Sequence, residues 1–251
     1  MSGKNARQTL TVMEGGAVAD GVETSPAELK LSDRAHNQIK ELIVRCELKP
    51  GSEVTEASLA ERCGLGKAPI RAALTRLTNQ GLITPLDRRG YMVTPITMRH
   101  VNDLFQLRQF LEPAAAEAAA VTIKDPALVE NLRKLSSEQL ARLDEVSLTE
   151  FLAINREYHV TIANMTRNER LTALMGQLMD EMERLIHLGL APRIRVGAAC
   201  KSHIELFNAI KDGEGSRARE IAAAEIEKAR QMVIDAIMRD SRLLDLNLAA
   251  I

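Results

Sequence analysis

The chain has 251 residues, of which 45% are hydrophobic but only 2% aromatic, so its core must rest on Leu, Ile, Ala, Val and Met, a composition that favours helix over sheet. The net charge of −1 shows no overall preference for a polyanion, yet residues 34–95 carry 10 Lys/Arg against 6 Asp/Glu, while the segments on either side are acidic. No stretch approaches the ~18 uninterrupted apolar residues of a membrane span, and three widely separated cysteines fit neither a disulfide framework nor a zinc ribbon, so we expect a cytoplasmic protein without a membrane partner.

The N-terminal segment lacks sustained hydrophobic periodicity, and we expect a flexible tail over residues 1–32. Ser32 or Asp33 can cap the first helix. This helix should end near Leu48, because Pro50-Gly51 follows directly and cannot continue it.

Two further short helices and a hairpin are predicted before residue 96. The second helix begins after the N-cap Thr55 and ends at Gly64, and the third runs from about Lys67 to Gly81. The pattern then changes to two runs of β-forming residues around a turn at residues 87–90. The two runs are Leu82–Leu86 and Tyr91–Thr94. Three short helices followed by a small hairpin are the plan of a winged helix-turn-helix.

The rest of the chain shows helical periodicity alone. Apolar stripes mark six segments: 98–121, 126–143, 148–165, 168–190, 194–211 and 216–239. Such helices bury their stripes most simply in a compact antiparallel bundle. We therefore expect a mainly α protein, with a winged helix-turn-helix domain at 33–96, a six-helix antiparallel bundle at 97–240 and a C-terminal tail at 241–251.

The third predicted helix has two distinct faces. An apolar face packs inward, whereas a polar and basic stripe points outward. A helix in the major groove needs cations for phosphates, hydrogen-bonding groups for base edges and small residues where the backbone comes close. The residues expected to contact DNA are Lys67, Ala68, Pro69, Arg71 and Thr75 on the helix, and Arg88, Arg89 and Gly90 in the wing. The alternative is an ordinary amphipathic surface helix with a solvated basic face.

Four polar residues of the predicted bundle could converge on a divalent ion. Asn155 and His159 are four residues apart and share a helix face, His203 lies early in the fifth helix, and Glu225 lies in the sixth. Imidazole, amide and carboxylate groups suit Zn²⁺ or Ni²⁺. A histidine on a helix can equally be a surface residue or a hydrogen-bonded core residue, so the spacing leaves both interpretations open.

The first part of the chain resembles a known family. The motifs that carry the resemblance are Leu48–Val54, Leu59–Leu65, Pro69–Leu77, Gly81–Ile83 and Gly90–Val93. Together they look like the N-terminal domain of GntR-family regulators, which implies binding to double-stranded operator DNA. Gly66-Lys67-Ala68 stands where the family usually has Ser-Arg-Thr, and Ala72 stands where Glu is common. These departures make the base readout unusual, because Lys67 lacks the guanidinium fork.

The second part resembles the FCD effector domain of the FadR-type subgroup, in its smaller, VanR-like branch. The motifs are Arg108–Pro113, Tyr158-His159 and His203-Ile204. The resemblance implies a divalent metal held by an Asp four residues before a His and by two further His. His159 and His203 match this pattern, whereas Asn155 stands in place of the Asp and Glu225 in place of the last His. A metal-free pocket, in which the amide and the histidines hydrogen-bond the effector, is the alternative.

Arg108 is the remaining candidate. The resemblance implies that an Arg on the first bundle helix pairs with the carboxylate of a small organic acid. A structural salt bridge to Glu112, four residues later, explains Arg108 equally well.

These features predict an effector-controlled repressor that binds a pseudo-palindromic operator as a homodimer. The effector would act on the DNA-binding domains through the linker at residues 95–97 and the first bundle helix. Two alternatives belong to other classes. One is a metal-dependent hydrolase built on His159, His203 and Glu225, and the other is a scaffold that keeps the fold without binding DNA.

Overall fold

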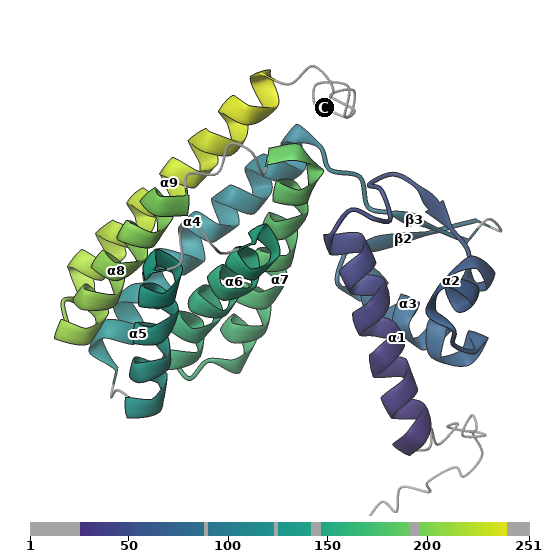
Figure 1. The fold of residues 1–251 in the computed structure, drawn as a ribbon, viewed down its shortest axis with the longest axis horizontal. Coiled ribbons are helices and arrows are strands. Elements are labelled where there is room, and N and C mark those ends of the chain that lie inside the picture. The colour runs from purple at the N-terminus through teal and green to yellow at the C-terminus, as the bar shows by residue number, and fades with distance from the viewer. Residues whose placement is uncertain (1–25, 88–89, 123–124, 142–146, 191–195, 240–251) are drawn as a thin grey trace, which may run out of the picture.

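The computed structural model describes residues 26–87, 90–122, 125–141, 147–190 and 196–239, which form a small N-terminal unit and a helical bundle (Figure 1). The N-terminal unit contains α1 (Pro26–Val44), β1 (Glu53–Val54), α2 (Glu56–Cys63), α3 (Lys67–Asn79), β2 (Ile83–Leu86) and β3 (Gly90–Val93). The bundle contains α4 (Met98–Val121), α5 (Pro126–Ala141), α6 (Leu148–Met165), α7 (Glu169–Leu185), η1 (Ile186–Leu190), α8 (Val196–Asp212) and α9 (Gly215–Arg239). The predicted fold class is confirmed. Within the described ranges, no helix is both long and apolar enough to cross a membrane.

The first helix differs from its prediction at both ends. It begins at Pro26 rather than at Ser32 or Asp33, so the expected tail is wrong for residues 26–32. Proline is favoured at the first helical position, because its fixed φ suits the helix and its missing N–H is not needed there. The helix ends at Val44 rather than near Leu48. The other tail predictions, before residue 26 and from residue 240 onward, fall outside the described residues.

The predicted hairpin belongs to a three-stranded antiparallel sheet with strand order β1-β3-β2. The sequence gives no sign of β1, which has only two residues and therefore no alternation to detect. Val54 of β1 pairs with Tyr91 of β3. Gly90 has a φ of +104°, and a Cβ atom there would lie 2.4 Å from the carbonyl oxygen of Val54. The close approach of β1 to the wing therefore requires glycine.

Local capping fixes the second helix as predicted. Thr55 forms a capping box with Ser58, and Gly64 ends the helix with a φ of +63°. The inward faces of α1, α2 and α3 then meet in one small core, which includes Ile39, Leu59, Ile70, Leu74 and Leu77. This packing presents the opposite face of α3 to solvent.

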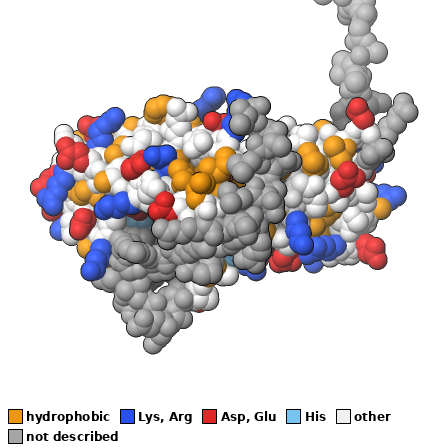
Figure 2. Space-filling view, turned by 90° about the horizontal axis from the view of Figure 1, so that it is seen from above, with side chains coloured by type: hydrophobic (Ala, Val, Ile, Leu, Met, Phe, Trp, Pro, Cys, Tyr) orange, Lys and Arg blue, Asp and Glu red, His pale blue; other side chains and the backbone are white. Residues whose placement is uncertain are grey.

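The six bundle helices match the predicted segments to within about two residues at each end. The main difference is that α7 continues into η1, a five-residue π-helix. α4 packs along α9, α6 packs on α7, and α5 packs on α6 and α8. On the face of the molecule shown in Figure 2, charged side chains of both signs are interspersed over the bundle. The described residues of the bundle on that face therefore form no extended positive surface for a nucleic acid.

Candidate nucleic-acid interface and metal centre

The outward face of α3 carries the predicted DNA-contacting residues. Ile70, Ala73, Leu74 and Leu77 are buried, while Lys67, Ala68, Arg71 and Thr75 are exposed and Pro69 is half-buried. Gly66 caps the helix without a side-chain hydrogen bond. The first backbone N–H groups of α3 thus have no side-chain acceptor at the N-cap, which suits contact with an anion such as phosphate.

Arg71 is already oriented by a neighbour. Its Nε and Nη2 donate to the two carboxylate oxygens of Glu56 on α2, at 3.0 and 2.9 Å. The side chain is still 68% exposed, so the guanidinium remains accessible. The Thr75 hydroxyl donates to the backbone carbonyl of Arg71 at 3.1 Å. The two α3 residues that could read base edges therefore sit side by side on one turn.

The wing prediction is tested only in part. Arg88 and Arg89 lie outside the described residues. Gly90 has a structural reason to be glycine, since its backbone lies against Val54. The close approach to Val54 alone explains why residue 90 is a glycine, without any contact with DNA.

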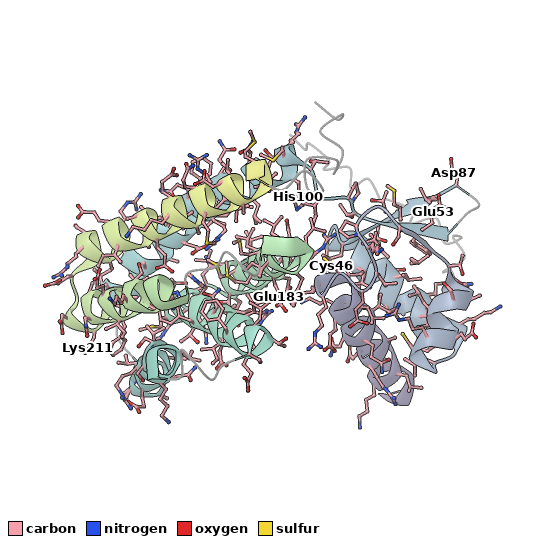
Figure 3. The ribbon with its side chains drawn as sticks, turned by 45° about the horizontal axis from the view of Figure 1, so that its top comes forward. Cys46, Glu53, Asp87, His100, Glu183 and Lys211 are labelled. Atoms are coloured by element: carbon pink, nitrogen blue, oxygen red, sulfur yellow. The ribbon has the colours of Figure 1, made fainter. Side chains whose placement is uncertain are left out.

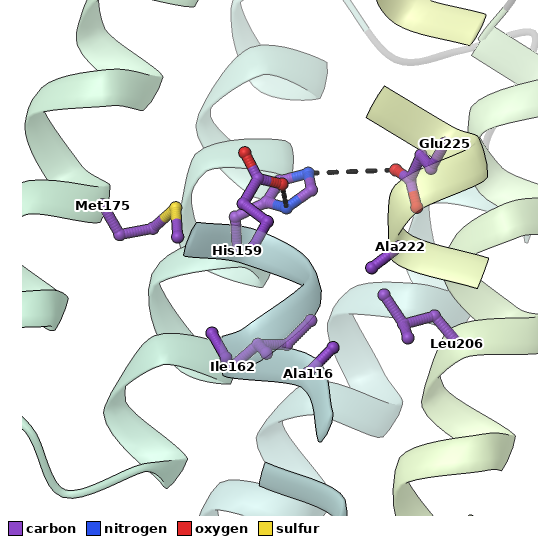
Figure 4. A pocket seen from close by; sticks show the side chains of 9 residues that line it. Ala116, His159, Ile162, Met175, Leu206, Ala222 and Glu225 are labelled. Carbon is purple, nitrogen blue, oxygen red and sulfur yellow. Dashed lines mark ion pairs between the residues drawn. The ribbon is translucent and has the colours of Figure 1, made fainter. Parts of the chain in front are cut away.

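In the bundle, three of the four predicted metal ligands converge. His159 on α6, His203 on α8 and Glu225 on α9 each offer a ligand atom, and these atoms lie within 4.8 Å of one another. Glu225 Oε1 is 2.8 Å from His203 Nε2. The same oxygen is 3.9 Å from His159 Nε2, a pair that Figure 4 shows. Both histidines are buried, and Glu225 is half-buried. Oε2 of Glu225 is buried with no hydrogen-bond partner in the described part of the chain.

Glu112 joins this site, although the sequence suggested it only as a partner of Arg108. Its Oε2 lies 3.1 Å from Nδ1 of His159. Burial by itself would raise the pKa of Glu112, but the charges of Arg108 and His159 outweigh burial and lower it to about 2. An ionised carboxylate only accepts hydrogen bonds, so Nδ1 of His159 carries the proton and Nε2 is left facing Glu225.

His203 is fixed from the other side by Tyr158. The tyrosine hydroxyl donates to the backbone carbonyl of His203 at 2.8 Å, and the two rings stack with their centroids 4.1 Å apart. Burial also opposes ionisation of Glu225, but the neighbouring His203 and His159 lower its pKa. The site thus combines two imidazoles with two ionised carboxylates.

The cavity at this cluster is small. Its volume is about 10 Å³, which is enough for one water-sized species. It is lined by Glu112, Ala115, Ala116, His159, Ile162, Met175, Leu206, Ala222 and Glu225. Asn155 is half-buried one turn before His159 and is not one of these lining residues.

Arg108 is only 4% exposed, and its Nε donates to Oε1 of Glu112 at 2.5 Å. Of the two predictions for this residue, the structure displays the salt bridge. Arg108 is not one of the residues lining the cavity, so its expected contact with an effector would require the pair with Glu112 to open.

Comparison with known proteins identifies both domains. The family model described as "Bacterial regulatory proteins, gntR family" matches residues 31–93, and the model described as "FCD domain" matches residues 103–228. The chain belongs to the GntR family of transcriptional regulators, in the group that carries an FCD domain.

Relatives with names of HTH-type transcriptional regulators are similar over most of the chain. One is "Uncharacterized HTH-type transcriptional regulator YdhC" of Bacillus subtilis (strain 168), 25% identical over 74% of this chain and 83% of that protein. Another is "HTH-type transcriptional repressor RspR" of Escherichia coli (strain K12), 21% identical over 76% of this chain and 83% of the repressor. The solved structure "E. coli McbR/YncC" has the same fold, with a TM-score of 0.71 and 20% identity over 82% of this chain and 97% of that one. The family and these relatives are regulators and not enzymes, so the hydrolase alternative is set aside.

Proposed function

We propose that this GntR-family regulator is a cytoplasmic repressor that binds a pseudo-palindromic operator as a homodimer and senses a small organic acid through a divalent metal. One observation carries the proposal. His159, His203 and Glu225 converge at a buried cavity in a domain that is joined to an exposed DNA-reading helix. Buried groups of this kind are costly unless they are paired or hold an ion, and the internal pairs leave Oε2 of Glu225 without a hydrogen-bond partner in the described part of the chain.

The residues present fit Zn²⁺ or Ni²⁺. Two imidazoles and a carboxylate are a reasonable donor set for either ion. Glu112 accepts a hydrogen bond from His159, which is how a ligating imidazole is usually oriented. The buried Oε2 of Glu225 supplies lone pairs that no described donor uses. We assign His159, His203 and Glu225 as ligands, and we keep Asn155, one turn from His159, as the proposed fourth.

The charges around the cavity indicate how an acid would be held. Arg108 is neutralised by Glu112, and both Glu112 and Glu225 line the cavity. The cavity of about 10 Å³ would have to widen to admit an organic anion, and without a metal the anion would meet net negative charge there. A bound metal would supply the missing positive charge and an open coordination position. The metal-free alternative, in which Asn155 and the imidazoles hydrogen-bond the acid directly, is disfavoured by the same two carboxylates.

Metal content and thermal stability test the sensing proposal. We expect Zn²⁺ or Ni²⁺ to raise the melting temperature of the full-length protein, since a ligand that binds only the folded state stabilises it. The rise should be lost in His203→Ala and kept in His100→Ala, which removes a half-buried histidine paired with Glu181 outside the site. A panel of small carboxylic acids is then screened on the metal-loaded protein. If elemental analysis finds no metal and neither metals nor acids shift the transition, the sensing proposal is wrong.

DNA binding is tested by gel shift with an operator fragment selected by the protein from a random-sequence library. We expect affinity to fall as salt rises and to be lost in Arg71→Ala. Arg62→Ala is the matched control, because Arg62 is an exposed arginine on α2 that also pairs with a glutamate, Glu47. Absent or salt-independent binding would favour the scaffold alternative.

The homodimer is proposed to form across α4. Leu107, Phe110 and Val121 on this helix are 37%, 65% and 70% exposed. Glu117 is the one charged residue between them with an exposed side chain, at 41%, and Arg219 pairs with it at 2.8 Å, so two copies of this face can meet without strong like-charge repulsion. Sedimentation should show weaker association for Phe110→Glu than for Gln109→Glu, which places the same charge on a neighbouring exposed position. Equal association of the two variants would place the interface elsewhere.

A further inference from the structure

Three contacts join α7 directly to the DNA-binding domain. Arg184 is only 1% exposed, and its Nη2 donates to the carbonyl oxygen of Thr94, where the linker leaves β3, at 2.7 Å. The Cys46 thiol donates to the backbone carbonyl of Arg184 at 3.5 Å, and Figure 3 shows Cys46 at this boundary. One turn earlier on α7, Asp180 forms an ion pair with Lys40 of α1 at 2.5 Å. The boundary is therefore held by buried polar groups of a single helix.

Asp180 is shared between the two domains. Its Oδ2 pairs with Lys40, while its Oδ1 accepts a hydrogen bond from Nε of Arg156 on α6 at 3.0 Å. The side chain of Asp180 is only 8% exposed, so one nearly buried carboxylate pairs with two cations at once. Gly176, one turn before Asp180, makes room for this arrangement, because a Cβ atom there would lie 3.0 Å from Nη2 of Arg156.

Both bundle helices that meet at Asp180 also line the metal cavity. α6 contributes His159, three residues after Arg156, and α7 contributes Met175. A helix moves largely as a rigid element, so a shift of α6 against α7 at the cavity changes the Arg156–Asp180 pair. Because Lys40 uses the same carboxylate, that change reaches α1.

We propose that Asp180 is the coupling residue between the domains. Its charge clamps the DNA-binding domain to α7 and so sets the DNA affinity of the ligand-free protein, and occupancy of the cavity acts through the same clamp. Only the second half rests on the proposed sensing function. The route differs from the one expected from sequence, through residues 95–97 and α4, because α7 contacts the DNA-binding domain directly. A carboxylate that holds two cations at once can release one of them and keep the other, which would give the discrete arrangements that a switch requires.

The ligand-free, full-length protein suffices for the main test. Lys40→Gln and Asp180→Asn each remove one charge of the pair, and Arg34→Gln removes an exposed cation from the same helix as a matched control. Circular dichroism checks folding, and Lys40, with a side chain that is 22% exposed, provides the milder variant should Asp180→Asn unfold. Amide hydrogen exchange in residues 26–44 reports the clamp, and operator affinity reports its consequence.

If the clamp exists, amide hydrogen exchange in α1 should be faster in both Lys40→Gln and Asp180→Asn. Operator affinity should fall by about five-fold or more in both, and Arg34→Gln should show neither change. Simple electrostatics predicts opposite effects, since losing Lys40 would weaken binding to the polyanion and losing Asp180 would strengthen it. Unchanged exchange, or operator affinities that move in opposite directions, would overturn the proposal. A further arm adds ZnCl₂. A wild-type protein whose DNA affinity ignores zinc contradicts metal sensing, whereas a zinc response that survives in both variants contradicts transmission through Asp180.

Discussion

The buried ion pair between Arg108 and Glu112 gives the sharpest test of how the bundle is held together. Arg108→Gln removes one partner and leaves the carboxylate uncompensated at a position that is only 5% exposed. Breaking such a pair costs about 3–5 kcal/mol in the free energy of unfolding, because the remaining charge can neither reach water nor find an equal partner. Glu112 keeps its hydrogen bond from His159, so we expect a cost near 3 kcal/mol.

The same helix supplies a matched control. Arg99 and Asp103 on α4 are also four residues apart, but their side chains are 77% and 67% exposed and their closest charged atoms are 3.7 Å apart. Exposed pairs of this kind contribute about 0.5 kcal/mol or less. Arg99→Gln should therefore leave the stability nearly unchanged. Both pairs join an arginine to an acid four residues later on the same helix, and the acids differ by one methylene, so burial is the main difference between the pairs.

Urea denaturation at pH 7, followed by circular dichroism, measures both variants. We also expect the double variant Arg108→Met with Glu112→Leu to be more stable than Arg108→Gln alone, because it removes both charges. If Arg108→Gln costs no more than Arg99→Gln, the pair is screened by solvent and the argument from burial is wrong. The metal-loaded Arg108→Gln protein also tests the effector contact expected from sequence. If this variant keeps its stability but its melting temperature no longer responds to acids, the result would support a contact between Arg108 and the effector.

Three further predictions concern single residues. Glu112 has a pKa of about 2 in the folded protein against an ordinary 4.5. This difference stabilises the folded state by about 3 kcal/mol above pH ~4.5, and the stabilisation is lost as the pH falls towards 2. In urea titrations between pH 7 and 2, Glu112→Gln should lose this pH dependence. Gly90→Ala should destabilise the winged domain by about 2 kcal/mol or more, since its Cβ would overlap the carbonyl oxygen of Val54. Gly66→Ala, which meets no atom closer than 3.9 Å, should change the melting temperature little, and equal effects would refute the steric argument. Ser147→Ala removes the capping box of α6 and should cost about 1 kcal/mol in a urea titration, whereas no loss would mean that tertiary packing alone fixes this helix end.

The elements that sequence predicted well are those with strong local signals. Thr55 and Gly64 bound α2 through contacts within one or two turns, and the apolar stripe of α3 survives intact in the core. β1 and η1 were missed because neither has a local pattern. β1 exists only where β3 pairs with it, and η1 is a short continuation of α7 in a different hydrogen-bond register.

The candidate site shows where helical spacing stops being informative. Asn155 and His159 share a face of α6, as predicted, but the cavity is lined by His159 and Ile162, so it opens toward the C-terminal side of the histidine. Asn155 lies one turn on the other side, about 5–6 Å along the helix axis. Spacing along one helix cannot decide on which side of His159 a neighbouring helix leaves space. The role of Glu112 was hidden for the same reason, since α4 meets α6 only in the folded chain.

In the proposed metal site, the anionic ligand stands at a different position from the one that the resemblance implies. The pattern of the resembling domains places one anionic Asp before the first histidine, whereas here that position is the neutral Asn155 and the anion is Glu225, on α9. The proposed set thus has the same number of anionic ligands, but its charge lies on α9, the helix that packs along α4. Glu225 lies close enough to His203, at 2.8 Å, to bind it in the absence of an ion. A metal must therefore compete with this internal pair, and an acid that enters afterwards must share the metal with Glu225. Both competitions would weaken binding relative to a site with a free carboxylate, as expected if the proposed sensor is to release its ligand.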